Sequence, residues 1–121
     1  MLNVLTDKAA TAAYSPAKGH PVVIYTCKFK PEHFRRGVEI VKEHFPKAQA
    51  QSETHKKRFN IFLERPSTHE IVNVSFFDGG PDVDHWHASK ERLKTVDELQ
   101  NMLVKPIDVQ VFKVDHIAGA F

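Results

Sequence analysis

The chain has 121 residues, of which 41% are hydrophobic and 26% are charged, and its formal net charge is +2. This length fits one domain with a core of its own, and the mixed charges exclude a disordered or fibrous chain. The one cysteine, Cys27, excludes an internal disulfide and a multi-cysteine metal cluster. The small net charge gives no indication of nucleic-acid binding.

Residues 1–20 lack the basic start and long apolar run of a secretory signal. No apolar run in the chain approaches the roughly 18 residues that cross a bilayer. We therefore expect a poorly ordered arm over residues 1–20 and one domain over residues 21–121. The free cysteine and the missing signal favour a cytoplasmic protein without membrane association.

The readable pattern starts at residues 22–29, where β-branched and aromatic side chains follow a proline and predict a strand. A helix is predicted next, with Pro31 in its first turn and Pro46 as its end. Four large apolar residues at spacings of four, three and four form its buried stripe. These residues are Phe34, Val38, Val41 and Phe45.

The second half of the chain predicts two more strands, a long helix and a last strand. Residues 58–64 and 70–77 alternate in polarity and are joined by a short turn, which suits an antiparallel hairpin. Apolar residues at helical spacing predict one helix over residues 83–104, and residues 108–114 alternate again. Both faces of the strand at 70–77 carry large apolar side chains.

The order strand, helix, strand, strand, helix, strand predicts an α+β fold of the ferredoxin-like βαββαβ type. Two right-handed crossovers would place both helices on one face of a four-stranded antiparallel sheet. The other face would then expose apolar residues, and a second copy of the sheet is the simplest cover. We therefore predict a homodimer whose two sheets face each other around a partly apolar chamber.

Three segments resemble a known family: KFKPEHF, SFFDGGPDVDHWHASKERL and KPIDVQVFKV. They are similar to the dimeric α+β barrels of the antibiotic biosynthesis monooxygenase type, which include quinol monooxygenases. The resemblance covers about residues 21–115. It implies a homodimer and a monooxygenase that uses dioxygen on a small phenolic or quinol compound in an apolar cavity. It implies no cofactor and no metal.

The resemblance also suggests site residues. Many members carry a histidine or tryptophan early in the helix after the third strand, a place that Trp86 takes here, with His85 and His87 beside it as further catalytic candidates. For substrate binding we select Tyr25, Asn73, Ser75 and Phe77, a mixture of polar and apolar groups on neighbouring strands. The haem-degrading branch uses an asparagine, a tryptophan and a histidine. At those places this chain has Tyr25, Phe77 and Val96, so haem breakdown is not expected.

Each candidate also has a structural interpretation. Trp86 is a natural anchor for packing between helix and sheet. His85 and His87 could be solvated, and Asn73 and Ser75 could pair across a dimer interface. Three ligand-type residues that share one helix face also favour a solvated surface over a metal site. They are Asp84, His87 and Glu91.

Two other functions remain open. A barrel of this type could bind a small apolar ligand, or serve a stress role, without turnover. RNA-recognition domains share the strand order, but they need aromatics within a glycine-containing basic motif. The strand EIVNVSFF has neither glycine nor flanking lysine or arginine, so we expect no nucleic-acid partner.

Overall fold

The computed structural model describes residues 15–51 and 57–119, so most of the expected N-terminal arm lies outside the described residues. Four strands form one antiparallel sheet in the order β2-β3-β1-β4. This order confirms the predicted ferredoxin-like α+β fold. The strands are β1 (Pro21–Lys28), β2 (Lys57–Arg65), β3 (Glu70–Phe77) and β4 (Asp108–Lys113).

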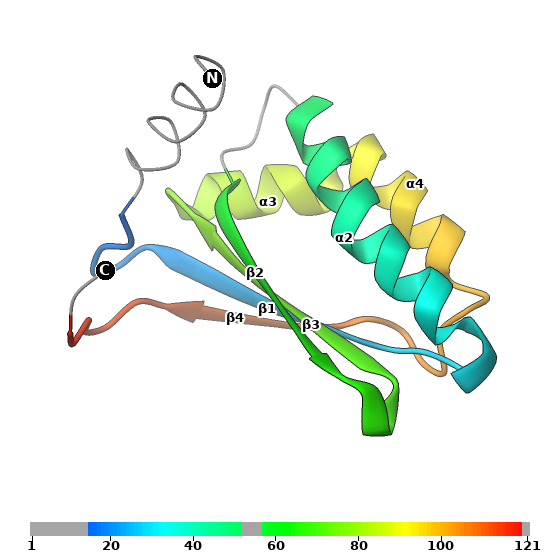
Figure 1. The fold of residues 1–121 in the computed structure, drawn as a ribbon. Coiled ribbons are helices and arrows are strands. Elements are labelled where there is room, and N and C mark those ends of the chain that lie inside the picture. The colour runs from blue at the N-terminus through cyan, green and yellow to red at the C-terminus, as the bar shows by residue number, and fades with distance from the viewer. Residues whose placement is uncertain (1–14, 52–56, 120–121) are drawn as a thin grey trace, which may run out of the picture.

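The helices gather on one side of the sheet, as Figure 1 shows. They are α2 (Phe34–Gln51), α3 (Gly80–Ala88) and α4 (Lys90–Leu99), with two short 3-10 turns, η1 (Pro31–His33) and η2 (Pro66–Thr68). In the part of the chain that the structure describes, no helix is long and apolar enough to cross a membrane.

The sheet face beneath the helices holds the core. The register places Tyr25 opposite Asn73 and Cys27 opposite Ile71, and all four side chains are buried. This confirms the predicted alternation along β3. The predicted stripe of α2 is also confirmed, because its four large apolar residues are all buried. Buried aromatic and aliphatic groups from both layers make one continuous cluster.

The opposite face of the sheet is apolar and has no helix over it in the described chain (Figure 1). Val74 of β3 lies here between Ile24 of β1 and Ile61 of β2. Phe59 and Phe76 stack edge to face at a centroid distance of 5.3 Å. We call this surface the open face. Its members are Val22, Ile24, Phe59, Ile61, Leu63, Val72, Val74, Phe76 and Phe112.

The predicted end of the first helix is wrong. Helix α2 does not end at Pro46 but continues to Gln51. Proline removes one backbone hydrogen bond there, while Phe45, the residue before it, is buried against Trp86 and holds that turn in place.

The single helix expected over residues 83–104 is divided at Ser89. The Ser89 hydroxyl donates to the carbonyl of Trp86 and accepts from the backbone N–H of Arg92. The hydroxyl therefore binds a carbonyl group in the last turn of α3 and acts as the N-cap of α4. The second helix also ends earlier than expected, at Leu99.

Gly37 lies where α2 crosses the end of β1. A Cβ atom at this position would overlap the ring of Phe29, which is buried. A glycine inside a helix costs about 1 kcal/mol relative to alanine. The close approach of helix and ring explains why glycine fits this position.

Candidate functional site

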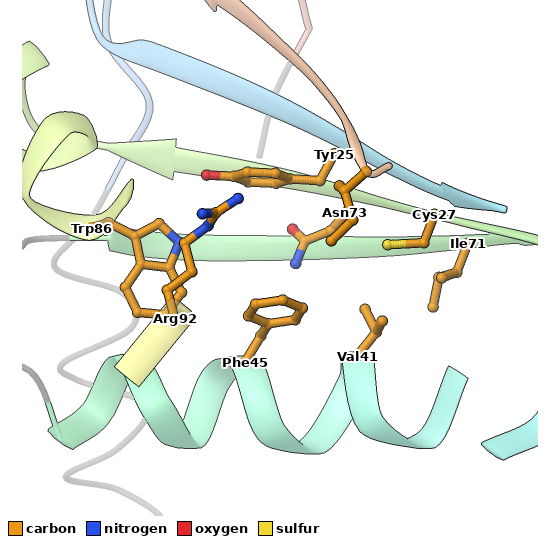
Figure 2. A pocket seen from close by; sticks show the side chains of 9 residues that line it. Tyr25, Cys27, Val41, Phe45, Ile71, Asn73, Trp86 and Arg92 are labelled. Carbon is orange, nitrogen blue, oxygen red and sulfur yellow. The ribbon is translucent and has the colours of Figure 1, made fainter. Parts of the chain in front are cut away.

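A small pocket lies between the covered face of the sheet and the three helices (Figure 2). Its walls are mostly apolar, with a few polar groups from the strands and from α4. About 20 Å³ is accessible to the centre of a water molecule, which is room for about one water. The lining residues are Tyr25, Cys27, Val41, Phe45, Ile71, Asn73, Trp86, Arg92 and Ile107.

Tyr25 connects the pocket to α3 through its hydroxyl group. The hydroxyl oxygen lies 2.8 Å from Nε2 of His87, and it also accepts a hydrogen bond from the side chain of Trp86. Burial raises the pKa of Tyr25 above its usual value, against the opposing effects of Arg92 and Trp86. Tyr25 therefore keeps its proton, and it donates this proton to Nε2 of His87 in the histidine tautomer that carries its hydrogen on Nδ1.

Arg92 brings a positive charge to this pocket. Its guanidinium carbon lies 5.9 Å from the centre of the Tyr25 ring, within the range of a cation–π contact. Burial lowers the pKa of Arg92, but an arginine stays charged in proteins. Among the described residues no carboxylate forms an ion pair with Arg92. A half-buried cation without a counter-ion is costly, so an anion in the pocket would be favourable.

A buried polar network lies behind the pocket. Oγ of Ser75 lies 2.7 Å from the amide oxygen of Asn73 and 2.9 Å from that of Asn60 on β2. Ser75 is fully buried and Asn73 is 4% exposed. Only Asn73 of these three residues lines the pocket.

The sequence matches no family model and no curated protein. Solved structures share its fold. Rv0793 from Mycobacterium tuberculosis gives a TM-score of 0.68 at 15% identity, covering 83% of this chain and 99% of that one. A protein from Nitrosomonas europaea, provisionally named an antibiotic biosynthesis monooxygenase, gives 0.69 at 10% identity, covering 88% of this chain and 100% of that one. One from Deinococcus radiodurans with the same provisional name gives 0.67 at 12% identity, covering 84% and 98%.

The chain has the fold of the antibiotic biosynthesis monooxygenase family. On this monooxygenase-family fold the predicted site residues separate into two groups. Tyr25, Asn73 and Trp86 line the pocket, and His87 reaches it through the Tyr25 hydroxyl. The others do not line it. Ser75 lies behind Asn73, Phe77 is fully buried in the core, and His85 is exposed on α3.

The position of the pocket differs from that of the predicted chamber. A chamber was predicted between two facing sheets, but Tyr25, Asn73 and Ser75 lie on the sheet face that the chain's own helices cover. The alternation of β3 defines two faces without saying which one the helices cover. In the described segments, no three histidine, cysteine or acidic side chains are placed to hold a metal ion.

Arg92 was missed by sequence reasoning because a charged helical residue normally faces water. The signal that could have found it is Ser89, a typical N-cap residue followed by a new helix. The break at Ser89 changes the direction of the helix axis. A prediction that assumed one continuous helix therefore could not show that Arg92 points towards the sheet. Asn60 was missed because only the pairing of β2 with β3 brings it to Ser75.

Cys27 gives a pH-dependent prediction. Burial raises the pKa of its thiol from 9.0 to about 12. Above pH 9 the unfolded chain releases this proton while the folded protein keeps it, so the free energy of unfolding should fall as the pH rises from 9 towards 12. The slope should be about 1 kcal/mol per pH unit. Urea unfolding across this range should show a smaller slope for Cys27→Ala, and equal slopes would contradict the assignment.

Proposed function

We propose that the protein is a cofactor-independent monooxygenase that oxidises a small phenol or quinol with dioxygen. The observation that carries the proposal is Arg92, a half-buried cation without a carboxylate partner among the described residues, beside an apolar pocket. An ionised phenol would supply a negative counter-charge for Arg92. Its flat ring suits apolar walls such as Phe45 and Trp86. The family fold supports the same chemistry.

In the proposed reaction the phenol first loses a proton to the Tyr25 hydroxyl while that hydroxyl passes its own proton to Nε2 of His87. This concerted transfer suits Tyr25, since its raised pKa opposes a free tyrosinate. Arg92 then stabilises the phenolate.

The oxidation itself takes place between the phenolate and dioxygen. The phenolate gives one electron to dioxygen, and the phenoxyl radical and superoxide combine at a ring carbon. The proton held by His87 returns to the peroxide, which loses water. One phenol and one dioxygen thus give one quinone and one water.

A phenol is larger than the enclosed space, so the pocket must open for a substrate to enter. Arg92 and Ile107 are the only half-buried members of the lining, while the others are buried. We therefore propose that a ligand enters between these two side chains. The rest of the wall would stay in place.

Oxygen consumption tests this function. The purified protein is incubated with a panel of one-ring to three-ring phenols and quinols, and dissolved oxygen and quinone absorbance are followed. We expect uptake of one dioxygen for each quinone formed. Absence of oxygen uptake across the panel would contradict the proposal.

Replacing Arg92 with methionine should weaken phenolate binding by about tenfold or more, because the ionised oxygen loses its charged partner. Arg92→Lys keeps the charge and should retain part of the affinity. Arg36→Met is the matched control, since Arg36 is exposed and pairs with Glu39 on the surface of α2. Titration with 4-nitrophenol, whose anion is yellow, measures the effect. Equal affinity of Arg92→Met and the wild type for 4-nitrophenol would contradict the proposed role of Arg92.

A second candidate is a small-ligand-binding protein without turnover. The closed pocket favours it, because only about one water fits before any side chain moves. Binding of 4-nitrophenol without oxygen uptake from any quinol of the panel would support this alternative.

We also propose that two chains form a homodimer through the open face. This proposal is supported by the exposure of large apolar residues there, including Leu63 at 53% and Phe112 at 49%. A contiguous apolar surface of this kind is typical of an interface. The expected partner is therefore a second copy of the chain, with the pockets on the outer sides of the two sheets.

A further inference from the structure

The hydroxyl group of Ser75 has two hydrogen-bond contacts, and it cannot be the donor in both. Its hydroxyl oxygen lies within hydrogen-bond distance of the amide oxygens of both Asn60 and Asn73. A hydroxyl group has one hydrogen and donates it once. One of the two amides must therefore turn its NH₂ group toward Ser75 and act as the donor. The oxygen and nitrogen of an amide have nearly the same shape, so the hydrogen bonds decide this orientation.

The two distances indicate which amide is turned. The contact of Ser75 with Asn73 is 2.7 Å, and that with Asn60 is 2.9 Å. Hydrogen bonds from O–H to oxygen are commonly about 2.7–2.8 Å long, whereas those from N–H to oxygen are about 2.9–3.0 Å. Asn60 is thus assigned as the N–H donor to Ser75, which in turn donates to the oxygen of Asn73.

This order of donors fixes what Asn73 presents to the pocket. Because its oxygen accepts from Ser75, its NH₂ group points away from that network. Figure 2 shows the Asn73 amide nitrogen on the side of the pocket that Phe45 closes. Within the described residues Ser75 is the only hydrogen-bond partner of the Asn73 side chain, which is 4% exposed. A buried donor without an acceptor costs about 1–3 kcal/mol unless a ligand supplies one.

We propose that Asn60, which does not line the pocket, is a positioning residue that acts through Ser75 to hold Asn73 as a donor. With Arg92, the pocket then offers positive potential and a hydrogen-bond donor to the same ligand. Such a site selects an ionised oxygen over a neutral hydroxyl, because a phenolate only accepts. The selectivity rests on the proposed function, whereas the amide orientation does not.

The opposite orientation predicts the opposite selectivity. If Asn73 donated to Ser75, its carbonyl oxygen would face the pocket and repel a phenolate. A single change at Asn60 should produce this state. Asn60→Asp places a carboxylate that only accepts, so Ser75 must donate to residue 60 and Asn73 must turn. Asn60→Leu has a similar shape and adds no charge, but it removes the donor to Ser75, so either orientation of the Asn73 amide then satisfies Ser75.

Nuclear Overhauser effects in the ligand-free protein test the orientation directly. In the wild type the NH₂ protons of Asn73 should lie near the ring protons of Phe45, and in Asn60→Leu these contacts should weaken. In Asn60→Asp the NH₂ protons should lie near the β protons of Ser75 instead. Wild-type contacts from the Asn73 NH₂ group to Ser75 would overturn the proposal.

Binding of 4-nitrophenol tests the selectivity. The wild type should bind the yellow anion in preference to the neutral form, Asn60→Asp should bind the anion about tenfold more weakly, and Asn60→Leu should fall between the two. Ser75→Ala interrupts the network without adding a charge, and it should also weaken anion binding. Unchanged anion binding in both Asn60→Asp and Ser75→Ala would overturn the selectivity. If the expected amide orientation is seen but no variant binds 4-nitrophenol, the proposed function fails and the orientation stands.

Discussion

Replacing Val74 with aspartate is expected to give a stable monomer instead of a dimer. Val74 lies at the centre of the open face, between Ile24 and Ile61. In an isolated chain the new carboxylate would stay in water, but between two packed sheets it would be buried without a partner. The cost of burying such a charge is several kcal/mol, which is large compared with the stability of most interfaces.

Sedimentation at micromolar concentration measures this effect. Val104→Asp is the matched control, because Val104 is 55% exposed and lies outside the open face. It should leave the dimer intact. A wild-type protein that sediments as a monomer, or a dimer that survives Val74→Asp, would refute the proposed interface. Since one chain supplies every lining residue of the pocket, the monomeric variant should keep its ligand binding.

Trp86→Ala is expected to lower the free energy of unfolding by about 3–5 kcal/mol. The indole is 1% exposed and packs edge to face on Phe45 at a centroid distance of 6.3 Å. Its removal leaves a cavity beside the pocket and takes one hydrogen bond from the Tyr25 hydroxyl. Trp86 thus packs between helix and sheet, as its structural interpretation holds, and also lines the pocket.

Urea unfolding of Trp86→Ala and Trp86→Phe separates packing from hydrogen bonding. The phenylalanine variant keeps a ring in the core and should lose less stability than the alanine variant. Leu93→Ala is the control, since Leu93 is 51% exposed on α4. A loss below about 1 kcal/mol for Trp86→Ala would show that the core does not depend on this residue.

The fold could be predicted because its signals are local and repeat. Alternation along residues 70–77 defined both faces of β3, and the stripe from Phe34 to Phe45 defined the buried side of α2. The break at Ser89 is different. Apolar residues continue at helical spacing on both sides of it, so the periodicity hides a cap that depends on two hydrogen bonds.

The candidate site was only partly predictable. Tyr25 and Asn73 could be selected because polar groups are unusual on strands that carry mostly apolar residues. The sequence could not show whether His85 or His87 contacts Tyr25. Residues two positions apart on a helix point in different directions, and here His87 faces Tyr25 while His85 is exposed. Asn60 meets Ser75 only through tertiary pairing, a contact that no local pattern contains.

The crossing of Gly37 over Phe29 has a consequence for the whole molecule. Because Gly37 has no side chain, the ring of Phe29 packs directly against the backbone of α2. This contact prevents α2 from shifting along β1. This contact fixes the position of α2 along the sheet. It therefore also fixes the positions of Val41 and Phe45, which line the pocket. Alanine, normally the residue of choice for strengthening a helix, would here push the two layers out of alignment.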